Sequence, residues 1–407
     1  MADNILLWTW LVMVFSPANK RLWELSANFD NEKDFVTALK NHDITQATDA
    51  EYERVDKISF EDAEKVLHNC DELNINYYCY KSEGYPEQLR KIANPPAVIF
   101  TKGNLDFLND KCIITVVGTR KPSGYSLEIT EKLCSQLIER NFVLASGFAN
   151  GIDQKVNRIS LANKSIPVAV CGTPLNSDYP QGSDEIKEKI VQNGVLISEY
   201  YPNCKIHGGS FTNRNRISVG ISSGVLFIEA GRDSHGLDNY NHAVYQGKPV
   251  FVVPPHDIYD SRYYGQRDLI RNECQTVFDA DDIVFAIKND KHYDIKYLKS
   301  VGEYNLPADD SVFYKSDDEK IKVKKPRKHK SQKDENNKPE IKEIIQVDYS
   351  TLDEIQTKIV RLLEQKNMLA DEIAAQTEMN ITDVLAELTE LEMFGVVKSL
   401  PGKMFGL

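Results

Sequence analysis

Short apolar runs that end in glycine turns alternate with amphipathic stretches through the middle of the chain. Residues 113–117 read IITVV, a run typical of a strand buried on both faces. Gly118 ends this run, and Pro122 is placed to open an amphipathic helix that extends to Arg140. The same pattern follows the runs at 142–145, 167–170, 195–197, 225–228 and 249–253. The alternation predicts a parallel, doubly wound α/β sheet with right-handed crossovers.

The glycine turns of such a sheet gather at the carboxyl ends of its strands, where its ligand binds. Backbone N–H groups at a strand–turn–helix junction favour an anion. Arg120 and Lys121 follow the first turn, although a helix start already carries about half a positive charge. These two cations either serve an anionic ligand or are solvated surface charges, and this stretch alone leaves both interpretations open.

The first 80 residues have a helical pattern instead. Leu22, Leu25 and Leu39 belong to apolar sets with helical spacing, and Ser59 followed by Asp62 marks a helix start. We expect a small all-α (SAM/HhH-like) domain over residues 1–80. Strand-like segments at 77–80 and 97–100 then lead into a Rossmann-like domain, which we place at residues 81–288.

The last third of the chain contains a polar segment and a second ordered region. Residues 289–348 are predicted to be a charged, disordered linker. Its lysine-rich block is either a solvated tether or a source of loose phosphate contacts. Residues 349–407 contain three amphipathic segments and a hairpin pattern, which predict a winged-helix domain. Its third helix carries Asp383 and Glu387, so we expect it to bind protein rather than duplex DNA.

Composition narrows the classes of function. The 407 residues carry a net charge of −12, which argues against coating nucleic acid by bulk charge but allows a local basic groove. Seven scattered cysteines without CxxC spacing indicate reduced thiols rather than a disulfide framework or a zinc site. The apolar residues 5–15 follow no Lys or Arg and are too short to span a bilayer. We therefore expect a buried first helix and a cytoplasmic protein without a membrane partner.

Residues 146–153, SGFANGID, form a second small-residue loop at a predicted helix start. Gly147 and Gly151 allow the backbone to approach a ligand closely. The G-x-G-x-x-G spacing is absent, so a mononucleotide site stays open but a nicotinamide cofactor is not supported.

Residues 211–218, FTNRNRIS, form the sharpest cluster of candidate binding residues. Arg214 has the forked geometry that binds phosphate oxygens. Phe211 offers a base a stacking surface, a contact worth about 1–3 kcal/mol in single-strand binders. The alternative is that an arginine of this cluster pairs with Glu199 or Glu229 in the mouth of the sheet. One structural arginine and one ligand-binding arginine would satisfy both readings.

Catalytic motifs are missing from the sequence. It has no GxSxG elbow, no Walker lysine loop and no histidines with metal-ligand spacing. We expect no catalytic residue, no metal and no cofactor. Glu229, together with Asp153, keeps glycosidic cleavage open as the alternative, which would make the protein an enzyme of the nucleotide phosphoribohydrolase type acting on nucleoside monophosphates.

The motifs VVGTRKPS, SGFANGID, AVCGTPLNSDYP, FTNRNRISVGIS, VLFIEA and GKPVFVVP occur in this order. In this order they resemble the DNA-processing protein A family (DprA, also called Smf). The resemblance covers nearly the whole chain, and the C-terminal winged helix matches the optional third domain of that family.

The resemblance implies an extended Rossmann fold that dimerises and has no catalytic activity. It implies that the protein binds and protects incoming single-stranded DNA and loads the RecA recombinase onto it during natural transformation of competent cells. The resemblance, taken together with the loops described above, assigns DNA binding to thirteen residues. These are Gly118, Thr119, Arg120, Lys121, Ser146, Gly147, Phe148, Asn150, Gly151, Phe211, Arg214, Asn215 and Arg216.

The chain departs from the family pattern in the segment 231–274 and at positions outside it. Asn239-Tyr240 stands where the family usually has a Thr-Ala pair, and Gln181 stands where a basic residue often follows Tyr-Pro. The sequence therefore supports the half of the site around Arg120 and leaves the other half undetermined.

Overall fold

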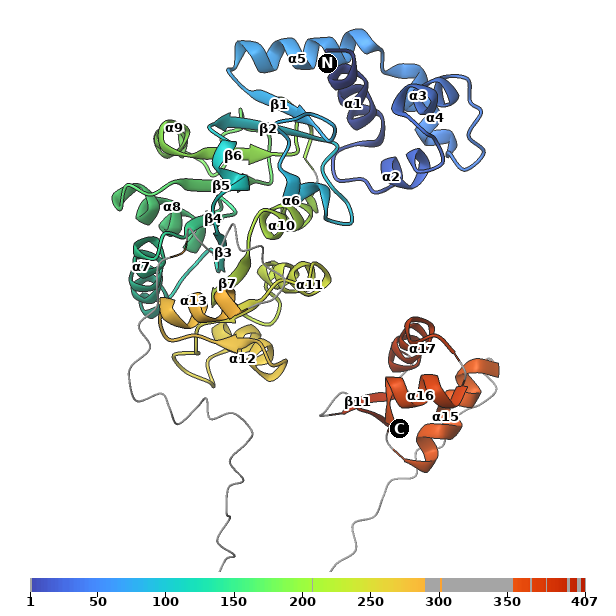
Figure 1. Ribbon diagram of the computed structural model, residues 1–407, viewed down its shortest axis with the longest axis vertical. Helices are drawn as coiled ribbons and strands as arrows, with labels where there is room; N and C mark the ends of the chain where they lie inside the picture. Colours follow the sequence, from blue (N-terminus) through green and yellow to red (C-terminus); the bar gives the residue numbers. More distant parts are fainter. Residues whose placement is uncertain are drawn as a thin grey trace, which may run out of the picture. The chain divides into compact units, whose positions relative to one another are not determined.

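The computed structural model describes residues 2–206, 208–289, 301, 354–366, 368–377, 379–393, 396–400 and 404–406. The linker expected at 289–348 lies outside these residues, apart from Asn289 and Val301. Contacts divide the chain into two compact units, 1–318 and 319–407, and each unit is described by itself (Figure 1).

The first unit is built on a sheet that has nine strands in the described residues, in the order β1-β2-β6-β5-β4-β3-β7-β8-β9. Neighbours from β6 to β9 are parallel, whereas β1 and β2 extend the β6 edge as antiparallel strands. The bounds are Asn76–Cys79 (β1), Val98–Gly103 (β2), Ile113–Gly118 (β3), Val143–Ser146 (β4), Pro167–Cys171 (β5), Val195–Ser198 (β6), Gly224–Glu229 (β7), Val250–Val252 (β8) and Gln275–Thr276 (β9). The predicted parallel, doubly wound sheet is confirmed.

Strand order reverses at β3. The chain moves from β3 through β4 and β5 to β6 on one side, and then returns to place β7, β8 and β9 on the other side. The gap between the carboxyl ends of β3 and β7 is therefore the topological switch point, where sheets of this kind bind ligands.

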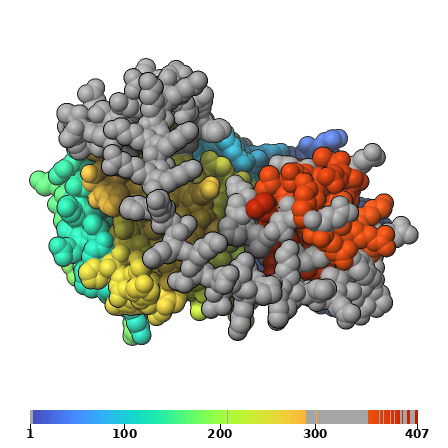
Figure 2. All heavy atoms as spheres, turned by 90° about the horizontal axis from the view of Figure 1, so that it is seen from below, coloured from blue at the N-terminus to red at the C-terminus, as the bar shows by residue number. Residues whose placement is uncertain are grey.

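Helices cover both faces of the sheet because alternate strand residues point to opposite sides. Ile114 and Val116 pack on the face of α7, α8 and α13, whereas Val117 packs on the face of α10, α11 and α12. The bounds are Gly124–Glu139 (α7), Ile152–Ala162 (α8), Ser210–Gly220 (α10), Asp238–Tyr245 (α11), Tyr264–Arg271 (α12) and Ala280–Asn289 (α13). Figure 2 shows the end of this unit where yellow and orange atoms of the segment from β8 to α13 meet the turquoise atoms of the α7–α8 region.

Five helices precede the sheet, as the apolar spacing predicted. They are Ala2–Phe15 (α1), Arg21–Ser26 (α2), Glu32–Lys40 (α3), Asp49–Lys57 (α4) and Phe60–Glu72 (α5). Ser59 caps α5 with a reciprocal bond to Asp62, which confirms the predicted helix start. The expected buried first helix is α1, in which Trp10 and Phe15 are fully buried. In the part of the chain that is described, no helix is long and apolar enough to cross a membrane.

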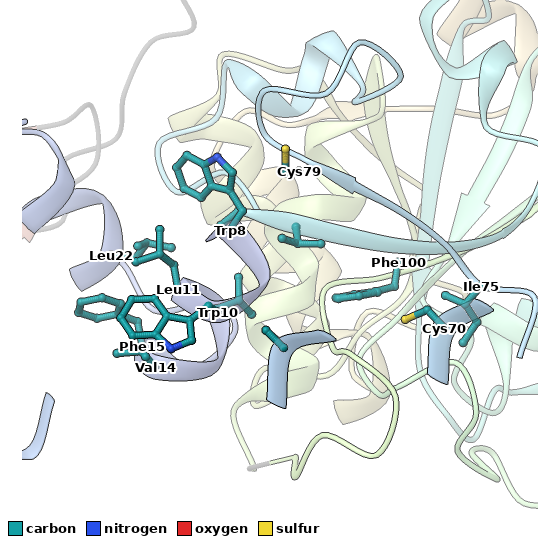
Figure 3. Packing of buried hydrophobic residues seen from close by; sticks show 14 of the residues in the cluster. Trp8, Trp10, Leu11, Val14, Phe15, Leu22, Cys70, Ile75, Cys79 and Phe100 are labelled. Carbon is teal, nitrogen blue, oxygen red and sulfur yellow. The ribbon is translucent and has the colours of Figure 1, made fainter. Parts of the chain in front are cut away.

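The N-terminal helices share a hydrophobic core with the sheet. Trp8 and Trp10 on α1 belong to the same buried cluster as Phe100 on β2, as Figure 3 shows. Strand β1 lies before the boundary expected at residue 80, yet it pairs with β2 in the main sheet. The helices therefore stabilise the edge of the sheet directly.

The start of α7 differs from the prediction. The helix begins at Gly124, two residues after Pro122, because Ser123 takes the N-cap position and its Oγ accepts a hydrogen bond from Ser126 N at 3.1 Å. The loop after β3 is consequently longer than the sequence suggested, and Arg120 and Lys121 lie in it rather than at the first helical turn.

The second unit has the predicted three helices and hairpin. Its helices are Glu354–Gln365 (α15), Ala370–Thr377 (α16) and Ile381–Met393 (α17), and β11 (Lys398–Leu400) pairs antiparallel with β12 (Met404–Gly406). A short strand that was not predicted, β10 (Met368–Leu369), completes this small sheet. Ile359, Leu363, Leu388 and Leu391 are buried between the helices, and Asp383 is exposed.

Candidate nucleic-acid interface

A cavity of about 670 Å³ lies at the switch point of the sheet. Its walls are the carboxyl end of β3 with the loop that follows, the loop after β4, one side of α10 and the loop after β7. We call it the switch-point cavity. The fold therefore brings together the turns that the sequence singled out.

Seven of the thirteen predicted site residues line the switch-point cavity. These are Gly118, Thr119, Arg120, Gly147, Phe211, Arg214 and Asn215. The remaining six are outside its lining: Lys121, Ser146, Phe148, Asn150, Gly151 and Arg216. The role of the lining residues in DNA binding stays a prediction, and the positions of the others have separate physical reasons.

Arg120 and Phe211 form the aromatic and cationic part of the lining. The Arg120 side chain is exposed, and its guanidinium carbon lies 5.4 Å from the centre of the Phe211 ring. This contact holds the charge at the cavity by a cation–π interaction. Lys121 is also exposed but does not line the cavity. Of the two interpretations left open, Arg120 fits a ligand contact and Lys121 fits a solvated surface cation.

Arg214 lines the same cavity from a buried position. Its Nη1 donates hydrogen bonds to the backbone oxygens of Gly147 and Val170. Burial lowers the pKa of the Arg214 guanidinium, and the nearby Asp153 carboxylate acts in the opposite direction. Arginine stays protonated in proteins, so a fixed positive charge is held at the cavity wall.

Asp153 is the acidic group of the cavity wall. Its Oδ2 accepts a hydrogen bond from Ala149 N at 3.1 Å, within the loop after β4. Burial raises the pKa of the Asp153 carboxyl, whereas Arg214 and the Ala149 N–H act to lower it. The carboxyl therefore shapes the loop and lies near enough to Arg214 for each group to act on the pKa of the other.

Arg216 has a structural role. Its Nη2 donates to Glu199 Oε1 at 2.6 Å, and the two side chains are 8% and 4% exposed. Arg216 also donates to the backbone oxygens of Asn94 and Asn213. The sequence allowed an arginine of this cluster to pair with Glu199, and the structure contains that ion pair. Arg216 is therefore not part of the cavity lining.

The loops after β3 and β4 pack directly on each other. Gly151 has φ of +81°, and a Cβ atom there would collide with the backbone of Thr119 and Arg120. A Cβ atom at Gly118 would collide with Ile152. Ile152 N donates to Thr119 O at 3.2 Å. Gly151 therefore lets the two loops pack closely beside Arg120, and its closeness to a ligand stays a prediction.

The other loop residues have local roles. Ser146 is fully buried, and its Oγ bonds to Asp153 O and to Asn157 Nδ2 at 3.3 and 3.0 Å. Phe148 is buried in the core with φ of +55°. Asn150 and Gly151 line a second cavity of about 500 Å³ beside Arg158 and Lys189.

The start of α7 binds an anion, but that anion belongs to the protein. Glu229, at the end of β7, accepts hydrogen bonds from Ser123 N at 2.9 Å and from Ser123 Oγ at 2.8 Å. The carboxylate therefore satisfies the positive end of the helix dipole. Glu229 is 1% exposed and does not line the switch-point cavity, whereas Asp153 does. The switch-point cavity is thus lined by one of the two carboxylates that the glycosidic-cleavage alternative requires at one site.

The loop after β7 forms the wall that the sequence left undetermined. Residues 231–236 line the switch-point cavity together with Asn239, Ser261 and Tyr264. Asn215 Nδ2 donates to His235 O at 3.3 Å, and Asn239 Nδ2 donates to Gly236 O at 2.9 Å. The signal that could have found this loop is its place after β7, the strand across the switch point from β3.

The cysteines and potential metal ligands add no further site. All seven cysteines are free, and five of them are buried. In the described ranges, no group of three His, Cys, Asp or Glu residues is placed to hold a metal ion.

The fold and the cavity define a doubly wound α/β protein with a partly cationic ligand cavity at its switch point. Residues 76–288 match the model of the family described as DNA recombination-mediator protein A. Residues 347–403 match the DprA winged helix domain. The chain belongs to the DNA recombination-mediator protein A family.

Individual relatives agree with this assignment. The chain is 31% identical over 219 residues to DNA processing protein DprA of Bacillus subtilis, covering 54% of this chain and 73% of the relative. It is 33% identical over 200 residues to DNA processing protein DprA of Streptococcus pneumoniae, covering 49% and 70%. The X-ray structure of DprA from Streptococcus pneumoniae superposes with a TM-score of 0.59 at 28% identity, covering 68% of this chain and 95% of that one.

Proposed function

We propose that this protein binds single-stranded DNA in the switch-point cavity and that it is a binding protein rather than an enzyme. The observation that carries the proposal is that Arg120 and Arg214 share one cavity with the Phe211 ring. Two cations and an aromatic face are the contacts that a flexible polyanion with exposed bases requires. The overall charge of −12 confines DNA to such a local site.

The wider role rests on the family. The description as a recombination mediator supports a protein that protects incoming single strands and loads the RecA recombinase onto them during natural transformation. We propose that it does so in the cytoplasm and as a homodimer formed through the Rossmann-like unit. Sedimentation equilibrium tests the dimer, and we expect a species of twice the chain mass of 46.3 kDa.

Binding is tested with a labelled oligothymidylate across a salt series. We expect Arg120→Ala to weaken binding about tenfold and to reduce the slope of log affinity against log salt by about 0.7, because one phosphate contact is lost. Arg271→Ala is the matched control, since Arg271 is 67% exposed and does not line the cavity. Equal binding by parent and Arg120→Ala contradicts the assignment of the cavity.

Recombinase loading is tested separately. The parent protein is expected to shorten the lag before RecA hydrolyses ATP on single-stranded DNA, and Arg120→Ala is expected to leave the lag long. A lag that the parent does not change would remove the loading role while leaving DNA binding intact.

A further inference from the structure

A groove of about 640 Å³ crosses the surface of the N-terminal helices. It is formed by α1, α3 and α5, and Figure 1 shows these helices at the opposite end of the first unit from α12. We call it the N-terminal groove. Its lining consists of Leu6, Leu7, Lys33, Val36, Thr37, Lys40, Asn41, Phe60 and Glu64. None of these residues lines the switch-point cavity, so the groove is separate from the site proposed for DNA.

The floor of the groove is apolar. Helix α1 is almost entirely apolar over residues 5–15, and a helix of this kind is normally covered on every side. Trp10 is fully buried, whereas Leu6 and Leu7 are only partly buried and line the groove. Phe60, the first residue of α5, is also partly buried and lines it. Part of the apolar surface of α1 and α5 is therefore left for another apolar group to cover.

Helix α3 supplies one wall of the groove. Lys33, Val36, Thr37 and Lys40 follow the i, i+3, i+4, i+7 spacing of a single helix face, and Asn41 continues this face at the C-cap. At 1.5 Å per residue, the wall from Lys33 to Lys40 is about 10 Å long. An elongated apolar groove between helices is the shape that binds a peptide segment through several of its side chains.

The charge of the groove defines the chemistry of its partner. Lys33 and Lys40 are exposed, and neither side chain forms an ion pair in the part of the chain that the structure describes. The Lys40 Nζ atom lies 3.9 Å from the centre of the Phe60 ring, so this ammonium group reaches from α3 to α5. Glu64 is the single carboxylate of the lining, which leaves the groove positive on a chain with a net charge of −12. A complementary partner carries carboxylates beside its apolar side chains.

We propose that the N-terminal groove is a docking surface for an acidic, apolar peptide segment of a partner protein. The apolar side chains of the segment cover Leu6, Leu7 and Phe60, and its carboxylates meet Lys33 and Lys40. The backbone of a nucleic acid also meets lysines, but it leaves the apolar floor of the groove uncovered. The inference goes beyond DNA binding at the switch-point cavity and does not depend on it.

The test selects peptides without assuming the identity of the partner. Short random peptides displayed on phage are selected on the full chain, and the enriched peptides are synthesised and measured by fluorescence anisotropy. We expect the enriched peptides to combine Asp or Glu with large apolar residues. A selection that enriches no peptide, or only peptides without an excess of acidic residues, overturns the inference.

Charge reversal then locates the contact. Lys33→Glu combined with Lys40→Glu is expected to weaken binding of an enriched peptide about tenfold, which corresponds to about 1.4 kcal/mol. Lys57→Glu combined with Lys65→Glu is the matched control, because both residues are exposed on the same group of helices and neither lines the groove. This control should bind the peptide as tightly as the parent. Equal binding by the parent and the groove variant overturns the inference.

Two changes in the peptide complete the test. Replacement of its acidic residues by lysine should weaken binding to the parent and restore binding to the groove variant, because the charges are exchanged on both sides. Replacement of its apolar residues by serine should abolish binding to the parent, and this comparison uses the unaltered protein. A serine-substituted peptide that binds as before would mean that the apolar floor is not the contact, and would overturn the inference.

Further measurements distinguish other occupants of the groove. The groove variant should keep the sedimentation mass and the oligothymidylate affinity of the parent. A lower mass would identify a second copy of this chain as the occupant, and weaker DNA binding would identify a nucleic acid; either result overturns the inference. Arg120→Ala should bind the peptide as the parent does, so a failure of the proposed DNA site is distinguishable from a failure of the groove. Thermal unfolding shows that each variant is folded at the assay temperature.

Discussion

The two sides of α10 use the same residue type for opposite purposes. Arg214 points its charge to the switch-point cavity, whereas Arg216, two positions later, pairs with Glu199 and bonds to Asn94 O. Positions two apart on a helix do not face the same side, so one short motif serves two environments. A basic motif therefore does not identify a binding surface until the partners of each cation are known.

The difference between the two arginines lies in their counter-charges. The charge of Arg216 is met by a carboxylate at 2.6 Å in a nearly water-free setting. Arg214 is bonded to neutral carbonyl groups, and the nearby Asp153 carboxylate acts against the lowering of its pKa by burial. Arg120 makes no ion pair among the described residues, and its guanidinium lies over the Phe211 ring. Neither Arg120 nor Arg214 forms an ion pair with a carboxylate among the described residues, so these are the cations left to bind phosphates.

The largest effect is expected on the side of α10 that faces Glu199. Arg216→Met leaves the Glu199 carboxylate buried and unpaired, so the free energy of unfolding should fall by about 3–5 kcal/mol. Denaturant unfolding measures this loss. The fraction that stays folded should bind oligothymidylate as tightly as the parent, because Arg216 does not line the cavity.

The double variant Arg216→Met with Glu199→Gln is the control for this prediction. It removes both charges, so most of the lost stability should return. If Arg216→Met alone kept its stability but lost DNA binding, the structural role assigned to Arg216 and the binding role assigned to Arg214 would have to be exchanged.

The second-largest loss of stability is expected for Arg214, on the side of α10 that lines the switch-point cavity. Arg214→Gln removes the hydrogen bonds to Gly147 O and Val170 O and takes away one of the two cations that act on the Asp153 carboxyl. We expect a loss of about 2 kcal/mol in the free energy of unfolding, because buried acceptors are left unsatisfied. Unlike Arg216→Met, this variant should also bind oligothymidylate more weakly once folded. Anisotropy measured beside denaturant unfolding separates the two effects, and unchanged binding would remove Arg214 from the site.

Sequence pattern predicted the parts of the molecule that depend on local periodicity. The strand runs from 113 to 253 and the cap at Ser59 were confirmed because short-range apolar spacing and capping chemistry decide them. Partners far apart in the chain were not predicted. Glu229 reaches Ser123 across 106 positions, and residues 231–236 join the cavity only because β7 lies beside β3.

The split between Arg214 and Arg216 shows the same limit. Helical spacing indicates that the two side chains diverge, but only the sheet decides which one meets Glu199. The sequence therefore allowed a structural and a ligand-binding arginine without telling them apart. The nearly continuous apolar character of α1 likewise predicted that the helix is buried. It did not predict that α1 shares a hydrophobic cluster with Phe100 of the sheet.

The smallest effect is expected at the far end of α10, where Lys248 is half-buried. Its Nζ donates to the last carbonyl groups of the helix, Val219 O at 2.6 Å and Gly220 O at 2.8 Å. Burial lowers the pKa of Lys248 from 10.5 to about 7. Between pH 7 and 10 the unfolded chain therefore holds a proton that the folded chain has released. Stability from this group must rise with pH in that window and be lowest below pH 7.

Lys248→Met tests the end of α10 without touching the cavity side. The variant lacks the titrating group, so its stability should not share the rise of the parent between pH 7 and pH 9. We expect the difference between parent and variant to grow by about 1–2 kcal/mol over this window, allowing for partial exposure of the side chain. Parallel denaturant unfolding at the two pH values measures it. Equal pH dependence of stability in parent and variant would mean that the Lys248 ammonium group stays hydrated in the folded protein. DNA binding by the two proteins should agree at every pH tested, because the arginines at the cavity do not titrate in this range.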